Sequence, residues 1–166
     1  MASAARDSGL DLVILRPPLV YGPGVKGNLR ALIALVASGA PLPLAAIENR
    51  RSLIFLDNLV DLLALACVHP SVGGRVLLAR DAVDLSTPEL IRTLASGLGR
   101  RPRLFPVPSA ALAAFGSVPA LGPALRRLTL SLQVDDAETR RVLGWSPALM
   151  PEAGLAATVR AFTRRR

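Results

Sequence analysis

Hydrophobic positions along the chain are grouped in short blocks that predict an α/β fold with few strands. Residues 10–15 are apolar apart from Asp11, which is the pattern of a buried parallel strand. Short extended segments are predicted at 10–15, 19–21, 42–47, 52–56, 75–79 and 104–107. Because longer helical stretches separate most of them, the pattern predicts few strands with flanking helices rather than a β-meander.

Helix starts and stops are marked by capping residues. Ser86 and Glu89 have the spacing of a capping box. We expect Asn28 to cap a second helix and either Asp57 or Asn58 to cap a third, because these side chains accept hydrogen bonds from the first turn. The predicted helices cover 2–8, 29–38, the stretch after residue 58 to about 68, 87 to about 98, 135–143 and 151 to about 163.

Composition narrows the possible functions. The chain has 166 residues, 51% hydrophobic and 19% charged, which predicts one compact domain rather than a disordered segment. Its net charge is +8, and 19 of the 20 basic residues are arginines, in short groups scattered along the sequence. Nucleic-acid-binding proteins concentrate such residues on one face, and only 4% of this chain is aromatic. We therefore expect no nucleic-acid partner, while an anionic ligand held by one or two arginines stays open.

Cysteine and histidine are too few for several kinds of site. Cys67 and His69 are the only residues of their types, so disulfides, cysteine-based zinc sites and most metal sites are excluded. Residues 1–7 have no secretory pattern, which predicts a cytoplasmic protein. The uncharged stretch 104–125 is long enough to span a bilayer, but four prolines interrupt it, and we expect no stable membrane insertion.

The loop at residues 22–27 fits the dinucleotide-binding pattern G-x-G-x-x-G, and Glu48 lies 21 residues further on. Two features argue against that interpretation. The preceding strand runs into Pro17 and Pro18, and the next extended segment contains prolines as well, whereas the central strands of a dinucleotide fold need their N–H groups. The glycines would still let the backbone approach an anion closely at the start of the following helix.

Four segments, in order, carry a resemblance to a known family. Residues 12–24 read LVILRPPLVYGPG, 51–60 read RSLIFLDNLV, 85–90 read LSTPEL and 135–145 read DDAETRRVLGW. They resemble the extended short-chain dehydrogenase/reductases, the NAD-dependent epimerases and dehydratases of nucleotide sugars. Glu138 stands where the family's late motif has a lysine. The resemblance implies that residues 1–166 form one C-terminal, substrate-binding part of a Rossmann-like enzyme, without the N-terminal dinucleotide-binding part.

The family's catalytic pair, Tyr-x-x-x-Lys, has no counterpart here. The only tyrosine is Tyr21, whose +4 neighbour is Val25, and Lys26 follows in a glycine- and proline-rich loop. We therefore assign no catalytic residue. The resemblance implies the substrate-binding half of an NAD(P)-dependent nucleotide-sugar epimerase, dehydratase or 4-keto reductase, which transfers hydride at the sugar C4 and is inactive as this half alone. The alternative is a non-catalytic nucleotide-sugar-binding module or a partner of a separate cofactor-binding chain.

The resemblance also implies where a UDP-hexose type of substrate would bind. Asn28 and Leu29 match the helix start that faces the sugar nucleotide, although Asn28 could equally be a plain helix cap. Arg51 matches the arginine that contacts the diphosphate, and a guanidinium suits two phosphate oxygens at once. Arg126 or Arg127 is a weaker candidate for a second such arginine. The segment whose backbone faces the uracil would contain Leu44, Ala45 and Ile47.

The resemblance assigns fewer residues to the cofactor than to the substrate. Pro17 and Val20 match positions near the nicotinamide. The intact family uses NAD or NADP, which we expect this chain not to bind alone, and an N-terminal cofactor-binding half is a candidate partner. The family forms dimers. From its position before a helix, Asp135 is interpreted as a cap rather than a catalytic acid.

Overall fold

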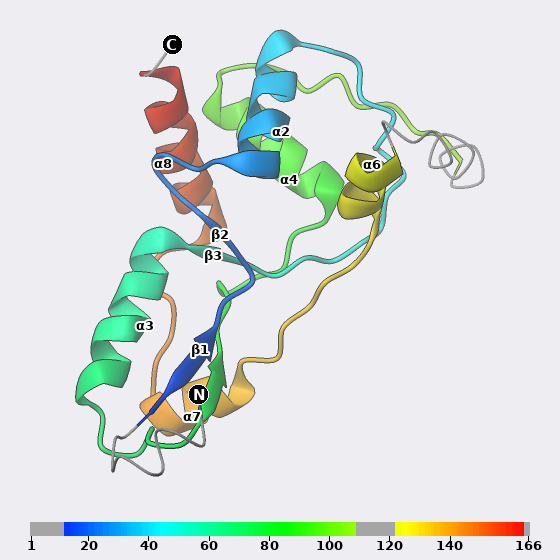
Figure 1. Ribbon diagram of the computed structural model, residues 1–166. Coiled ribbons are helices and arrows are strands. Elements are labelled where there is room, and N and C mark those ends of the chain that lie inside the picture. The colour runs from blue at the N-terminus through cyan, green and yellow to red at the C-terminus, as the bar shows by residue number, and fades with distance from the viewer. Residues whose placement is uncertain (1–11, 109–121, 165–166) are drawn as a thin grey trace.

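The computed structural model describes residues 12–108 and 122–164, and these form the α/β arrangement that the sequence predicts (Figure 1). Two pairs of short parallel strands lie at its centre. β1 (Ile14–Arg16) pairs with β4 (Val76–Leu78), and β2 (Leu19–Tyr21) pairs with β3 (Leu53–Phe55). The predicted helix at 2–8, the start of the strand at 10–15 and much of the stretch 104–125 lie outside the described residues.

Two consecutive prolines divide what would otherwise be one strand. Pro17 and Pro18 have no N–H to donate, so ladder pairing stops after Arg16. The chain resumes three residues later as β2, with a new parallel partner: Ile14 lies opposite Val76, whereas Leu19 lies opposite Leu53. This break places β2 in a two-stranded sheet separate from that of β1.

Six helices are described around the strands: α2 (Gly27–Ser38), α3 (Leu56–Val68), α4 (Thr87–Gly97), α6 (Gly122–Thr129), α7 (Ala137–Leu143) and α8 (Pro151–Thr163). They enclose two hydrophobic clusters. In the first, α2, α4 and α8 pack together on β2 and β3 (Figure 1), with Ile91 and Leu155 fully buried. In the second, α3 and α7 pack beside β1 and β4, around Ile54, Leu62 and Leu77. Burial of aliphatic side chains therefore stabilises both halves of the fold.

The predicted caps are partly right. The Ser86 side chain accepts the Glu89 N–H and the Glu89 side chain accepts the Ser86 N–H, which confirms the capping box. The other two predictions are wrong, because α2 and α3 begin one residue or more before the expected caps and have no side-chain cap. Asn58 is buried instead: its Nδ2 donates to the Leu149 oxygen, and its Oδ1 accepts the Leu149 N–H. A long-range contact therefore takes the amide that local spacing assigned to a cap.

The extended segments predicted at 42–47 and 104–107 do not form a ladder. A single parallel bridge joins Leu42 and Leu104. Pro41 and Pro43 flank the bridged residue and cannot donate, which explains why pairing does not extend. Within the described ranges, no helix has both the length and the apolar character needed to cross a bilayer.

Candidate functional site

Three of the residues singled out by resemblance are joined in one cluster. The Arg51 Nη1 donates to the backbone oxygen of Arg127, and the Arg127 Nη1 donates to Asn28 Oδ1 over 3.3 Å. Asn28 belongs to the first turn of α2, and Arg127 to α6, 99 residues away in sequence. We call Asn28, Arg51 and Arg127 the arginine cluster. It presents two guanidinium groups and one amide, which are donors suited to phosphate oxygens.

The backbone around Arg51 is held on both sides. Arg51 and Leu85 exchange two backbone hydrogen bonds of 3.0 and 3.1 Å, and the Ser52 N–H donates to the Leu132 oxygen over 2.8 Å. The Arg51 side chain is partly buried, and this burial lowers the pKa of its guanidinium. Because an arginine pKa starts above 12, the group stays charged at neutral pH. Arg51 therefore offers a fixed cation with donors left beyond its contacts to Arg127.

A buried amide that the sequence analysis missed positions α6 beside Arg51. Asn49 Nδ2 donates to the backbone oxygens of Leu128 and Leu130, both at 3.1 Å. Asn49 Oδ1 accepts the Thr87 N–H at 2.8 Å, and the Thr87 hydroxyl donates to the Leu128 oxygen at 2.6 Å. These bonds fasten the end of α6 to the start of α4. No local pattern marks Asn49, because its partners lie 38 to 81 residues away.

The other residues matched to the substrate, Leu29 and the predicted uracil-facing residues Leu44, Ala45 and Ile47, are either buried or line a separate pocket. Leu29 and Leu44 are 2% and 3% exposed and belong to the first hydrophobic cluster, so only their backbone could reach a ligand. Ala45 and Ile47 line a shallow pocket of about 440 Å³ beside the capping box of α4. The Ala45 N–H already donates to the Phe105 oxygen at 3.2 Å. The described contacts do not link the predicted uracil-facing residues Leu44, Ala45 and Ile47 to the arginine cluster, whereas Leu29 follows Asn28 directly on α2 with its side chain buried.

Pro17 and Val20 do not make a complete cofactor site. Pro17 is exposed between β1 and β2, and Val20 packs against the second hydrophobic cluster. Neither side chain offers a charge or a donor to a pyrophosphate. At Gly22, the first glycine of G-x-G-x-x-G, an added Cβ would lie 2.9 Å from the Leu56 Cβ. Close packing of the loop on α3 therefore explains this glycine without a nucleotide.

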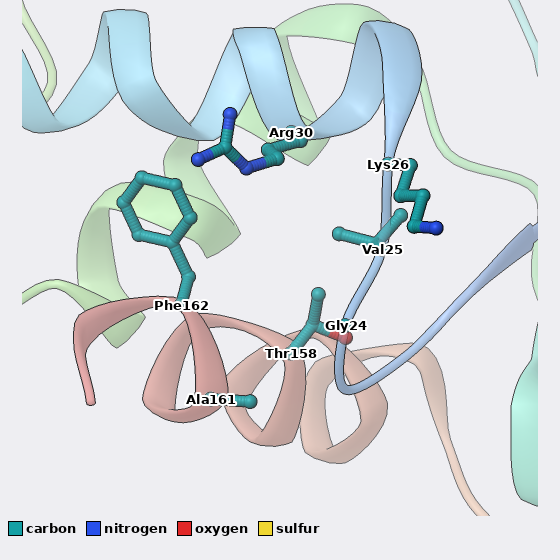
Figure 2. Close-up of a pocket in the computed structure, with 7 residues that line it drawn as sticks. All are labelled: Gly24, Val25, Lys26, Arg30, Thr158, Ala161 and Phe162. Atoms are coloured by element: carbon teal, nitrogen blue, oxygen red, sulfur yellow. The ribbon is translucent and has the colours of Figure 1, made fainter. Parts of the chain in front are cut away.

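Another pocket, of about 300 Å³, lies between α2 and α8 (Figure 2). It is lined by Gly24, Val25, Lys26, Arg30, Thr158, Ala161 and Phe162. None of the residues that the resemblance assigned to substrate or cofactor belongs to its wall.

The single tyrosine is a structural residue. Tyr21 is 1% exposed, and its hydroxyl donates to Asp81 Oδ2 over 2.6 Å. Burial, and then the bond to Asp81, raises the pKa of Tyr21 far above its usual range. Asp81 Oδ1 also accepts the Phe55 N–H at 3.1 Å and the Asn58 amide at 2.8 Å. Tyr21 is therefore neither accessible to a substrate nor able to ionise near neutral pH, which rules it out as an acid–base group.

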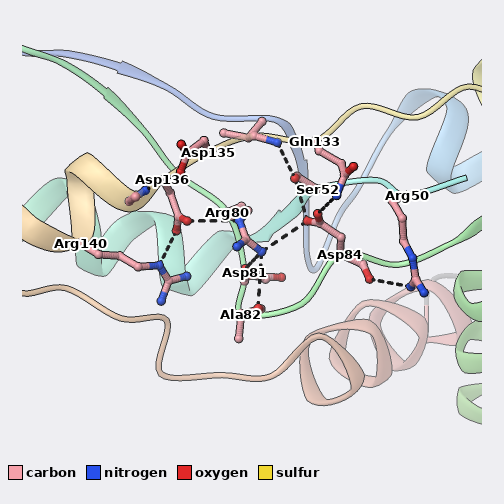
Figure 3. A network of polar contacts seen from close by, with 12 residues as sticks. Arg50, Ser52, Arg80, Asp81, Ala82, Asp84, Gln133, Asp135, Asp136 and Arg140 are labelled. Carbon is pink, nitrogen blue, oxygen red and sulfur yellow. Dashed lines mark hydrogen bonds and ion pairs between the residues drawn. The ribbon is translucent and has the colours of Figure 1, made fainter.

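A charged network joins the loop after β4 to α7 (Figure 3). Asp136, with its side chain 3% exposed, lies 3.2 Å from Arg80 Nε and 2.8 Å from Arg140 Nε. Arg80 also reaches Asp84, which accepts from Ser52 at 2.7 Å. Carboxylates balance the guanidinium groups, so this network ties elements together rather than presenting charge to a ligand. The neighbouring Asp135 accepts the Ala137 N–H at 3.0 Å, but the residue that precedes α7 is Asp136, so the predicted cap lies one residue too early. Among the described residues, no group of His, Cys, Asp and Glu could hold a metal ion.

Comparison with known proteins identifies the family of this chain. The family model for the NAD dependent epimerase/dehydratase family matches residues 1–78. UDP-glucose 4-epimerase of Vibrio cholerae is 40% identical over 163 residues, which is 98% of this chain and 50% of that protein. UDP-glucose 4-epimerase of Mycolicibacterium smegmatis is 29% identical over 94% of this chain and 47% of its own length. The chain belongs to the NAD-dependent epimerase/dehydratase family, and it spans about half the length of these relatives.

Solved structures confirm the fold. UDP-glucuronic acid 4-epimerase from Bacillus cereus, in complex with NAD, superposes with a TM-score of 0.73 at 16% identity, over 98% of this chain and 48% of that one. UDP-glucose 4-epimerase from Thermotoga maritima, with UDP-glucose, superposes with a TM-score of 0.68 at 21% identity, over 97% and 48%.

Proposed function

We propose that this chain is the nucleotide-sugar-binding half of an NAD(P)-dependent epimerase, dehydratase or 4-keto reductase. The observation that carries the proposal is the arginine cluster, in which Asn28, Arg51 and Arg127 converge from three separate segments. The Vibrio cholerae relative, which is named UDP-glucose 4-epimerase, supports a UDP-hexose type of substrate.

In this proposal the chain binds and orients the substrate. Arg51 and Arg127 would neutralise the diphosphate, and the Asn28 amide would turn from Arg127 to a phosphate oxygen. NAD or NADP, when bound by the complementary half, supplies the hydride chemistry at the sugar C4. Tyr21, the single tyrosine, offers no acid–base group to the substrate, because it is buried and bonded to Asp81. The chain would thus fix the pyrophosphate and leave proton and hydride transfer to groups outside it.

Titration of the chain with UDP tests the proposal. We expect Arg51→Gln and Arg127→Gln each to weaken UDP binding about 10-fold or more, because hydrogen bonds to charged groups contribute about 1.5–3 kcal/mol. Arg141→Gln is the matched control, since it removes the same charge from an exposed position on α7. Equal losses in all three variants would mean that UDP follows only the net positive charge, and the proposed site would be wrong.

A binding module that works with a separate cofactor-binding chain is the second candidate. The observation that favours it is an apolar stripe on α3, where Leu56, Val60, Leu63 and Val68 are 39%, 51%, 43% and 79% exposed. Leu56, Val60 and Leu63 recur at i, i+4 and i+7, so these three form one face that a complementary half could cover, and Val68 is exposed at the end of the same helix.

Activity in the presence and absence of that half separates the two candidates. With NAD and UDP-glucose, we expect no turnover by this chain alone. If a cofactor-binding half covers α3, turnover reconstituted with the remaining half of the Vibrio cholerae relative would be abolished by Val60→Asp. UDP binding to the same variant would be unchanged. Turnover by the chain alone would refute both forms of the proposal.

A further inference from the structure

The pocket between α2 and α8 combines an apolar floor with cations at its edge. Figure 2 shows Val25 and Thr158 directed into the space between the two helices, with Phe162 and Arg30 facing each other at one end. The Arg30 Cζ lies 5.9 Å from the centre of the Phe162 ring. This cation–π contact holds the guanidinium over the pocket while its planar N–H groups stay available.

No acidic side chain balances these cations at the pocket. Its lining contains Lys26 and Arg30 but no carboxylate. An adjoining hollow of about 310 Å³ shares Ala161 and adds Arg160 and Arg164, again without an acid. Within residues 12–108 and 122–164, none of these four cations takes part in an ion pair. Among the side chains that the structure describes, this surface therefore carries positive charge without a neighbouring acid, where the walls are apolar.

Helix stability does not account for Lys26 and Arg30. They lie at the N-terminal end of α2, whose first turn holds no acidic residue. A helix dipole places positive charge at that end, so nearby cations are unfavourable there. By contrast, Arg160 lies in the last turn of α8, where a cation is favourable. An anion bound beside Lys26 and Arg30 would relieve the repulsion that the helix imposes on them.

We propose that this pocket binds a small anion that carries an apolar group, of the class of phosphate monoesters of aromatic or aliphatic alcohols. The phosphate would lie against Arg30, and the flexible stem of Lys26 would bring its ammonium to the same group. The carbon part would lie on Val25, Ala161 and Phe162. A volume of about 300 Å³ is at the small end of ligand pockets, which suits one ring or a short chain.

The pocket is separate from the arginine cluster. Arg30 follows Asn28 by two residues on α2, and residues two apart on a helix point to different faces. The two sites also use different second elements, α8 for the pocket and α6 for the cluster. Binding at one site can therefore be measured without disturbing the other, and the proposal does not depend on the proposed enzyme function.

Three probes separate the contributions: phenyl phosphate, inorganic phosphate and benzyl alcohol, each titrated calorimetrically into the full chain at 0.15 M salt. We expect phenyl phosphate to bind at least 10-fold more tightly than either fragment. Arg30→Gln should weaken phenyl phosphate at least 10-fold and leave UDP binding unchanged. Ala161→Leu, which fills the floor, should weaken phenyl phosphate but not inorganic phosphate.

Controls decide between this pocket and general charge attraction. Arg51→Gln and Arg141→Gln should leave phenyl phosphate binding within twofold, and unchanged circular dichroism and melting curves should verify that each variant is folded. Equal affinity for phenyl phosphate and inorganic phosphate would overturn the proposal. So would an equal loss in Arg30→Gln and Arg141→Gln, or loss of phenyl phosphate binding in Arg51→Gln, which would place the ligand in the arginine cluster.

Discussion

Replacing Asp81 with alanine tests the polar centre of the fold. Asp81 is fully buried and accepts hydrogen bonds from the Tyr21 hydroxyl, the Phe55 N–H and the Asn58 amide, at 2.6, 3.1 and 2.8 Å. The carboxylate thereby joins β2, β3 and α3 to the loop after β4. Asp81→Ala would leave three buried donors without an acceptor.

The expected cost is large relative to the stability of a domain. An unsatisfied buried donor costs about 1–3 kcal/mol, and partial relaxation brings the expected total to about 3–5 kcal/mol. Domains of this size unfold with a free energy of about 5–15 kcal/mol. Asp81→Asn keeps one oxygen for Phe55 and Asn58, so we expect it to cost about 1–2 kcal/mol.

Urea unfolding followed by circular dichroism measures the effect. With a slope of about 1–3 kcal/mol per molar urea, Asp81→Ala should lower the midpoint by about 2 M or prevent folding. Asp61→Ala is the control: it removes an exposed aspartate of α3 and should change stability by less than about 0.5 kcal/mol. If the two variants have equal midpoints, or Asp81→Asn unfolds as readily as Asp81→Ala, the argument from unsatisfied donors is wrong.

The same centre predicts sensitivity to alkali. The pKa of Tyr21 is raised in the folded protein by burial first and by Asp81 second, above the ordinary value of about 10. The folded state then keeps a proton that the unfolded state releases. The stabilisation that protonated Tyr21 gives the folded state is complete below about pH 10 and decreases as the pH rises further. In Tyr21→Phe, the free energy of unfolding should therefore decrease less steeply with pH above about pH 10 than in the unchanged protein.

Two other changes test close packing and capping. Gly154→Ala should destabilise the protein by about 1–3 kcal/mol, because a Cβ there would lie 2.9 Å from Phe55 Cγ. Gly97→Ala, whose Cβ would lie 3.4 Å from its nearest neighbour, should be neutral or stabilise the protein by up to about 1 kcal/mol. Thermal melts of the two variants measure the difference, and an equal loss of stability in both would exclude the steric explanation. Ser86→Ala should cost about 1 kcal/mol through the lost cap. The hydrogen bond from the Ser86 N–H lowers the pKa of Glu89, so the stabilisation that ionised Glu89 gives the fold is present above about pH 4.3 and decreases as the pH falls. Glu89→Gln should therefore make the urea midpoint depend less on pH in the acid range. An unchanged pH dependence would argue against the capping box.

Features encoded within one turn of sequence could be predicted. The Ser86 capping box, the end of α2 at Ser38 and the helix that starts at Pro151 are all where the sequence places them. The two wrong caps have a common cause, since Asn28 and Asn58 bond residues 99 and 91 positions away. A local rule cannot anticipate which distant group competes for an amide.

Only those residues of the candidate site that belong to the matched family motifs could be predicted from the sequence. Arg51 and Asn28 came from matched motifs, and the structure links them through Arg127. Asn49 and Asp81, which organise the polar interior, lie in no periodic pattern and are defined only by partners that the fold brings to them. The extended segment expected at 42–47 and the strand expected at 104–107 share only one bridge, because the prolines in and beside them remove N–H groups.

The arginine cluster and the Asp81 centre differ in how strongly the fold determines them, and this difference bears on ligand binding. Asp81 is held by three bonds in a dry interior, whereas Arg127 and Asn28 are exposed and joined by one bond of 3.3 Å. Replacing that bond with contacts to a diphosphate costs little, because water already competes for both groups. A ligand there would add bonds between α2, α6 and the segment before β3 that carries Arg51, which the free protein largely lacks. Since it would bind the folded state alone, UDP at 100 times its Kd should raise the unfolding free energy by about 2.7 kcal/mol. At the same UDP concentration, that increase should fall to about 1.4 kcal/mol or less in Arg51→Gln, whose Kd we expect to be about 10-fold or more higher, and should be retained in Arg141→Gln. An equal increase in both variants would place the nucleotide elsewhere.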